Sequence, residues 1–157
     1  MESEFRLEHQ APVPTITVRF RASVRELPQR FAQIFADLER YLAENAVAAA
    51  GPPFAIYHGF GTAELDVEAG FPTERSLPPK GDIRSAALPE GMIATCVYTG
   101  PYRSAGAAYS ALSSWMHGQG LTAAGPFFES YLNEPKATPE SQLRTRIAVP
   151  VEAVESL

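Results

Sequence analysis

The feature that most constrains this chain is an internal repeat about 75 residues long. Residues 51–58 read GPPFAIYH and residues 125–132 read GPFFESYL, which share Gly-Pro-x-Phe-x-x-Tyr at an offset of 74 (125 − 51). The alternating segments 15–21 and 92–98 also correspond, at an offset of 77 (92 − 15). A third pair, in the same order along the chain, matches Leu65, Val67, Ala69 and Phe71-Pro72 with Leu143, Thr145, Ile147 and Val149-Pro150. Three matches in one order predict two copies of a single folding unit.

Hydrophobic periodicity predicts the same elements in each copy. Alternation of apolar and polar residues predicts strands over 15–22 and 92–99. Apolar side chains at helical spacing predict a helix from Leu27 to Leu42, and Ser23 to Glu26 has the spacing of a capping box. A matching helical stripe follows the second strand and ends at Gly118 and Gly120. The order predicted for each copy is therefore β-α-β-β, which makes the chain an α+β protein.

The two copies are expected to form one domain around a central groove. Module one covers about residues 13–73 and module two about 91–152, and the linker 72–91 contains four prolines and two glycines. A β-α-β-β unit buries one sheet face under its helix and leaves the other face to be covered. Two such units related by a pseudo-twofold axis would leave a groove between them, which is a natural small-molecule site.

Composition excludes several other classes of protein. The 157 residues carry 13 Lys and Arg against 18 Asp and Glu, a net charge of −5, so no basic surface for nucleic acid is expected. A single cysteine, Cys96, excludes an internal disulfide and a multi-cysteine metal cluster, and we expect it to be a small buried hydrophobe. Nucleotide-loop, nucleophile-elbow and metal-binding motifs are missing from the sequence, so no cofactor and no metal are expected.

The N-terminal residues MESEFRLEHQ are acidic where a secretory signal would be basic. No segment approaches the roughly 20 apolar residues of a membrane span. A cytoplasmic protein that does not bind membranes is therefore expected.

Alternation along the Gly-Pro strands decides which side chains share a sheet face. One face carries, by copy, Pro53, Ala55 and Tyr57, and then Phe127, Glu129 and Tyr131. The other face carries Phe54, Ile56 and His58, and then Phe128, Ser130 and Leu132. We assign the mostly apolar set Phe54, Ile56, Phe128 and Leu132 to the helix-covered core. The face of Glu129, Tyr131, Tyr57 and Ala55 is then expected to line the groove.

Glu129 is the most unusual residue of the sequence, because burial disfavours a carboxylate that no cation or hydrogen-bond donor compensates. It could hold a cationic ligand, accept a tyrosine hydroxyl or act as a general acid or base. It could equally be a solvated edge residue, or a partner for Arg144 or Arg146 on the next strand. The sequence leaves these readings open.

Aromatic residues near Glu129 divide into two sets. Tyr98 ends a strand and is placed to reach the groove, where tyrosines over a carboxylate would suit a flat or cationic molecule. Its strand corresponds in module one to the region of Arg19 and Arg21, so the groove is expected to be electrostatically lopsided. The aromatics at helical spacing, Trp115 among them, suit the core better, and His58 is expected to be structural or at the surface.

Together these residues resemble the GyrI-like small-molecule-binding domain, which also forms the effector-binding half of some AraC-type and multidrug-sensing transcription activators. The resemblance runs from about Thr15 to Val151, and its most specific parts are Gly100-Pro101-Tyr102 and Glu129-x-Tyr131-Leu132. It implies a tandem of β-α-β-β modules and a Glu129 that contacts ligand in the groove. The predicted ligand-binding residues are Glu129, Tyr57, Tyr131, Tyr98, Phe127, Ala55 and Trp115.

Three functions remain open at this point. The chain resembles a stand-alone binder of a lipophilic, cationic or aromatic compound, because 157 residues leave no room for a DNA-binding head. Some family members hydrolyse cyclopropane-bearing natural products, which would make Glu129 catalytic with Tyr57 and Tyr131. Others inhibit DNA gyrase, which would make gyrase or a regulator the partner. The ligand's identity and the oligomeric state are left open.

Overall fold

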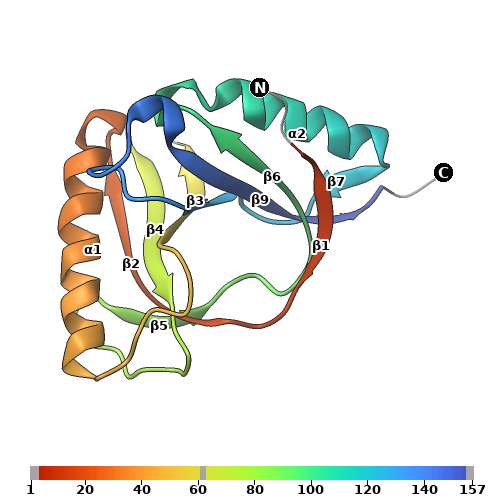
Figure 1. Cartoon of the computed structure of the whole chain (residues 1–157). Helices are drawn as coiled ribbons and strands as arrows, with labels where there is room; N and C mark the ends of the chain where they lie inside the picture. The colour runs from red at the N-terminus through yellow and green to blue at the C-terminus, as the bar shows by residue number, and fades with distance from the viewer. Residues whose placement is uncertain (1–3, 61–62, 155–157) are drawn as a thin grey trace. The chain divides into compact units, whose positions relative to one another are not determined.

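The structure is a computed structural model that describes residues 4–60 and 63–154 (Figure 1). The chain divides into two compact units, which we call the N-module, Pro12–Pro89, and the C-module, made of the described residues of 1–11 and 90–157. Each module packs one long helix, α1 or α2, against antiparallel strands. This arrangement confirms the predicted α+β fold of tandem β-α-β-β modules.

The N-module sheet has the strand order β3-β4-β2-β5, and every pairing in it is antiparallel. Its elements are β2 (Pro14–Ala22), the 3-10 turn η1 (Val24–Glu26), α1 (Leu27–Glu44), β3 (Phe54–Phe60), β4 (Leu65–Pro72) and β5 (Arg84–Ala87). The predicted capping box is present: Glu26 N–H donates to Ser23 Oγ, and the Glu26 carboxylate accepts from Ser23 N–H.

The C-module sheet has the strand order β1-β6-β9-β8, again antiparallel, and β7 pairs with the far end of β9. Its elements are β1 (Arg6–Gln10), β6 (Gly91–Thr99), the 3-10 turn η2 (Tyr102–Ser104), α2 (Gly106–Gly118), β7 (Leu121–Ala123), β8 (Phe128–Tyr131), the 3-10 turn η3 (Glu140–Gln142) and β9 (Arg144–Ala153).

Each module contains its own copy of one backbone contact, at the position that the sequence repeat predicts. Ala50 N–H donates to the Pro72 carbonyl at 2.9 Å, and Ala124 N–H donates to the Pro150 carbonyl at 2.7 Å. Each contact ties the Gly-Pro segment to the end of its module's last repeated strand. The helices correspond as well, because Leu38 of α1 and Leu112 of α2 are both completely buried.

One face of each sheet packs against its own helix. In the N-module, Phe20 of β2 contacts Phe31 of α1 edge-on, with ring centroids 5.9 Å apart, and Phe71 of β4 contacts Phe35 at 5.6 Å. In the C-module, the α2 side chains Ala108, Leu112 and Met116 pack in one cluster with Ala94, Cys96, Ile147, Val149 and Val151.

Strand register places the Gly-Pro strands opposite to the predicted orientation. Ala55 and Tyr57 lie directly across from Ala69 and Val67, which share the helix face with Phe71. Glu129 likewise lies across from Ile147, which belongs to the core under α2. Phe54, Ile56 and Phe128 therefore lie on the face away from the helix, which corrects the assignment made above. Hydrophobicity misled here because both faces are buried: Phe54 and Phe128 are each 1% exposed.

Short strands at the sheet edges were not foreseen. β1 and β5 each pair with one neighbour, β6 and β2 respectively, and both are largely exposed. A brief edge strand needs little hydrophobic alternation, so its sequence carries a weak signal.

Gly70 on β4 is required by close packing. A Cβ there would lie 2.3 Å from the Ile16 carbonyl oxygen and 2.6 Å from Thr17 Cγ2, whereas a Cβ at Gly59 on β3 would meet Asp66 Cβ at an ordinary 3.7 Å. We predict that Gly70→Ala lowers the free energy of unfolding by about 3 kcal/mol, whereas Gly59→Ala changes it by less than about 1 kcal/mol. Urea denaturation of both variants measures this, and equal stabilities would contradict the packing described here.

The thiol of Cys96 is 1% exposed, as the sequence predicts, and burial raises its pKa to about 11. The thiol therefore stays protonated at neutral pH, and a thiol is a poor nucleophile. We predict that iodoacetamide at pH 8 leaves the folded protein unmodified but alkylates Cys96 in urea. Rapid alkylation of the folded protein in a mass-spectrometric time course would show that the thiol is accessible.

Candidate functional site

A carboxylate held by two phenols lies under helix α2 of the C-module. Tyr109 of α2 donates its hydroxyl hydrogen to Glu129 Oε2, and Tyr131, two residues along β8, donates to Glu129 Oε1 at 2.9 Å. Hydrogen bonds of this kind stabilise the charged form of a carboxylate. Glu129 is therefore not a solvated edge residue. Of the roles left open by the sequence, the structure contains one, acceptance of a hydrogen bond from a tyrosine hydroxyl.

Aromatic rings surround this pair of hydrogen bonds. The Tyr109 ring lies 5.3 Å from the Phe127 ring, and the Tyr131 ring meets the Tyr102 ring edge-on at 5.6 Å. Burial first, and then the negative charge of Glu129, raise the pKa of the Tyr102 phenol above its usual value. We call these five residues the Glu129 cluster: Tyr102, Tyr109, Phe127, Glu129 and Tyr131.

Strand β9 supplies the floor beside the cluster. Thr145 lies directly across from Tyr131 on one side and from Tyr98 on the other. Tyr98 donates its hydroxyl hydrogen to the Pro101 carbonyl at 2.9 Å, which turns it back over the chain. Gly100 permits this conformation because it adopts φ +144°, and a Cβ there would lie 2.7 Å from the Tyr98 hydroxyl oxygen. The Gly100-Pro101-Tyr102 motif thus fixes where the Tyr98 hydroxyl lies, while strand register sets Tyr98 beside Thr145.

Trp115, Ala55 and Tyr57, the other residues predicted for the site, stay predictions as ligand-binding residues. Trp115 of α2 stacks on Phe5, with ring centroids 5.7 Å apart, as part of the core rim. Ala55 and Tyr57 belong to the N-module, where they lie on the face covered by α1. Whether the modules enclose a groove stays a prediction.

The arginines considered as partners of Glu129 lie on the other face of the sheet. Arg146 is directly across from Ser130, not from Glu129, and its guanidinium donates to Glu8 on β1 at 2.6 Å. Because side chains alternate along β9, Arg144 shares the face of Arg146. Neither residue is placed to neutralise Glu129.

Register also identifies the N-module counterpart of each site residue. Thr145 between Tyr98 and Tyr131 corresponds to Val67 between Phe20 and Tyr57, and Glu129 across from Ile147 corresponds to Ala55 across from Ala69. Tyr98 therefore matches Phe20, not Arg21 as predicted, because the strand offset is 78 (98 − 20) and not 77. An offset error of one residue exchanges the two faces of a strand.

This comparison separates the two modules chemically. At the counterpart positions the N-module has the apolar residues Ala55, Val67 and Phe20 where the C-module has Glu129, Thr145 and Tyr98. The same fold is therefore built with and without the polar groups, so folding alone does not demand them.

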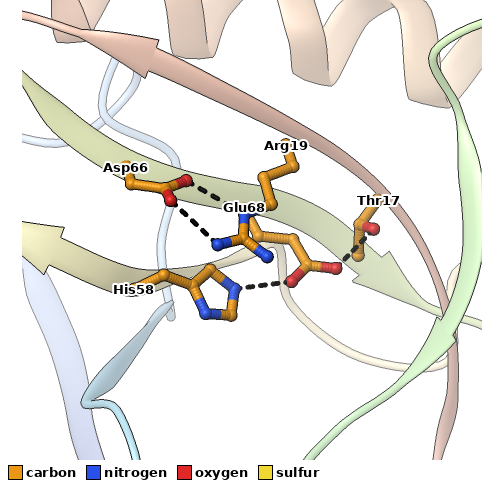
Figure 2. A network of polar contacts seen from close by, with 5 residues as sticks. All are labelled: Thr17, Arg19, His58, Asp66 and Glu68. Atoms are coloured by element: carbon orange, nitrogen blue, oxygen red, sulfur yellow. Dashed lines mark hydrogen bonds and ion pairs between the residues drawn. The ribbon is translucent and has the colours of Figure 1, made fainter.

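A second network of polar contacts lies on the N-module face away from α1 (Figure 2). Glu68, 9% exposed, accepts from Thr17 Oγ1 at 2.7 Å and lies 2.7 Å from His58 Nε2. Arg19 makes a two-point contact with Asp66, at 3.0 and 2.8 Å, and this hydrogen bonding lowers the pKa of Asp66. Sequence reasoning missed Glu68, although a charge within the buried run of β4 was a usable signal. His58 lies next to the β-bulge between Tyr57 and Gly59, and its role as a structural or surface residue stays a prediction.

An open cleft of about 600 Å³ also lies in the N-module, between α1 and residues 80–83. Its charged residues largely pair with one another: Arg40 with Asp37 at 3.2 Å, and Lys80 with Glu44 at 3.1 Å. This cleft has mixed charge and contains no residue of the Glu129 cluster.

Within residues 4–60 and 63–154, no group of three or more His, Cys, Asp or Glu side chains is placed to hold a metal ion. Among the same residues, no helix is long and apolar enough to cross a membrane.

Solved structures of known proteins share the fold. The C-terminal domain of EcmrR matches with a TM-score of 0.78 at 20% identity, covering 98% of this chain and 100% of that domain. In the EcmrR–DNA complex the TM-score is 0.83 at 19% identity, and the match covers 97% of this chain but 58% of the EcmrR chain. This chain therefore corresponds to little more than half of that protein.

Two further structures share the fold at lower similarity. A hydrolase from Listeria innocua matches with a TM-score of 0.72 at 11% identity, covering 95% of this chain and 92% of the other. SAV2435, solved with tetraphenylphosphonium bound, matches with a TM-score of 0.57 at 15% identity, covering 95% and 94%.

Comparison with functionally curated proteins finds no match. The family model of the GyrI-like small molecule binding domain, in contrast, matches residues 3–152, nearly the whole chain. With the duplicated fold described above, this match places the chain in the GyrI-like small-molecule-binding domain family.

Proposed function

We propose that this protein binds lipophilic organic cations at the Glu129 cluster. The observation that carries the proposal is a half-buried carboxylate set among four aromatic rings, at a position where the sister module has Ala55. A half-buried carboxylate beside aromatic faces attracts a large, weakly hydrated cation through both charge and cation–π contact.

The arrangement of donors also bears on how such a cation would bind. Tyr131 donates a phenolic hydrogen bond to Glu129 Oε1 at 2.9 Å. An arriving cation would compensate the carboxylate in place of that bond, so the site would adapt by turning one tyrosine. Tetraphenylphosphonium, the molecule bound in the SAV2435 structure, is a cation of this class and a suitable first probe.

Hydrolysis of a strained electrophile and binding of gyrase or a regulator stay predictions. In the free protein phenol hydroxyls already donate to both oxygens of Glu129. A general base must also accept from the attacking water, which each oxygen could do with its remaining lone pair. Binding needs only the carboxylate and the aromatic rings described above, whereas turnover needs in addition a water held in line with the reacting bond.

We predict that Glu129→Gln weakens tetraphenylphosphonium binding by about 10-fold or more, because it removes the buried charge and keeps the shape of the side chain. Isothermal titration calorimetry measures this directly. The matched control is Glu68→Gln, which removes the buried carboxylate of the N-module network and should leave the affinity within about twofold.

Equal losses in both variants would show a general effect of net charge, and an unchanged affinity in Glu129→Gln would exclude Glu129 as the anchor. A neutral compound of similar shape, triphenylphosphine oxide, should bind the wild type and Glu129→Gln with the same weak affinity.

A further inference from the structure

Thr145 of the C-module carries a buried hydroxyl group. The residue is 2% exposed, and its Oγ1 has no hydrogen-bond partner in the part of the chain that the structure describes. It lies on β9 directly between Tyr98 of β6 and Tyr131 of β8, on the sheet face that packs under α2. An unpaired buried hydroxyl lowers stability, because it gives up its hydrogen bonds to water and gains none in return.

The sister module shows that the fold does not need this hydroxyl. The counterpart Val67 lies between Phe20 and Tyr57 in the same register and is completely buried. Valine has the shape of threonine with a methyl group in place of the hydroxyl. The C-module therefore has the polar Thr145 where the N-module has the apolar Val67. This exchange lies on the same sheet face as the exchange of Ala55 for Glu129.

We propose that Thr145 Oγ1 donates a hydrogen bond to the ligand of the Glu129 cluster, so that the preferred ligand is a lipophilic cation that also carries an acceptor such as a carbonyl oxygen. This inference rests on the proposed function and narrows the class of ligand. Thr145 is two residues along β9 from Ile147, the partner of Glu129, so its side chain lies on the same sheet face as the carboxylate.

The arrangement also indicates how the ligand reaches the hydroxyl. Tyr131 is the cross-strand neighbour of Thr145 and at the same time donates to Glu129. A cation at Glu129 replaces that hydrogen bond and lets the Tyr131 ring turn away from Thr145. Tyr102, which packs edge-on against Tyr131, is 42% exposed and leaves room for this movement.

The test uses two cations that differ in a single acceptor: phenacyltriphenylphosphonium, which has a carbonyl group, and phenethyltriphenylphosphonium, which has none. We expect Thr145→Val to weaken binding of the phenacyl cation by about 5-fold and to leave the phenethyl cation unchanged, which is the effect of losing one hydrogen bond.

The chain offers a matched control in Thr15→Val. Thr15 of β2 is 1% exposed and its Oγ1 is likewise without a hydrogen-bond partner among the described residues, but it lies on the N-module face away from α1. This variant should change the affinity for neither cation. Without ligand, both variants should melt about 2 °C or more above the wild type, because each removes an unpaired buried hydroxyl.

The outcomes separate this inference from the function it rests on. If neither cation binds the wild type, the proposed function fails and this inference fails with it. If both bind but Thr145→Val weakens them equally or not at all, the anchor at Glu129 stands and the role of Thr145 is refuted. A lower melting temperature in Thr145→Val would give the hydroxyl a structural role and refute the inference as well.

Discussion

Helix α2 is joined to strand β8 through a carboxylate, and the character of the site depends on this contact. Tyr109 from the helix and Tyr131 from the strand both donate to Glu129, so the interior between helix and sheet contains a held negative charge. In the N-module the corresponding strand position is Ala55, and α1 instead presents Phe35 to Phe71 of the sheet. The same packing of helix on sheet therefore supports an apolar core in one module and a polar, aromatic-walled cluster in the other.

Duplication supplies an internal comparison that a single-copy fold lacks. The modules share their strand register, the contact between the Gly-Pro segment and a proline carbonyl, and the burial of a central helix leucine. Features common to both copies serve the fold. Features of one copy only, namely Glu129, Thr145 and Tyr98 against Ala55, Val67 and Phe20, are the ones that need another explanation, and ligand binding is the explanation we propose.

The sequence predicts the repeat and the order of elements, because hydrophobic period is a local property. It does not predict which sheet face meets the helix, since Phe54 and Phe128 are as deeply buried on one face as the residues under α2 are on the other. Nor does it reveal that Thr145 Oγ1 has no hydrogen-bond partner among the described residues or that the Glu68 carboxylate has two, because hydrogen bonds between strands depend on register. A shift of one residue in the assumed offset made Arg21, instead of Phe20, the N-module counterpart of Tyr98.

The central claim is that the polar cluster of the C-module, and not the open cleft of the N-module, takes the ligand. A crystal structure of the protein soaked with tetraphenylphosphonium tests this most directly. The account predicts the phosphonium against Glu129, with its phenyl groups on the tyrosine rings and the Tyr131 hydroxyl moved off the carboxylate. Density for the cation in the cleft between α1 and residues 80–83, with the Glu129 cluster unchanged, would contradict it.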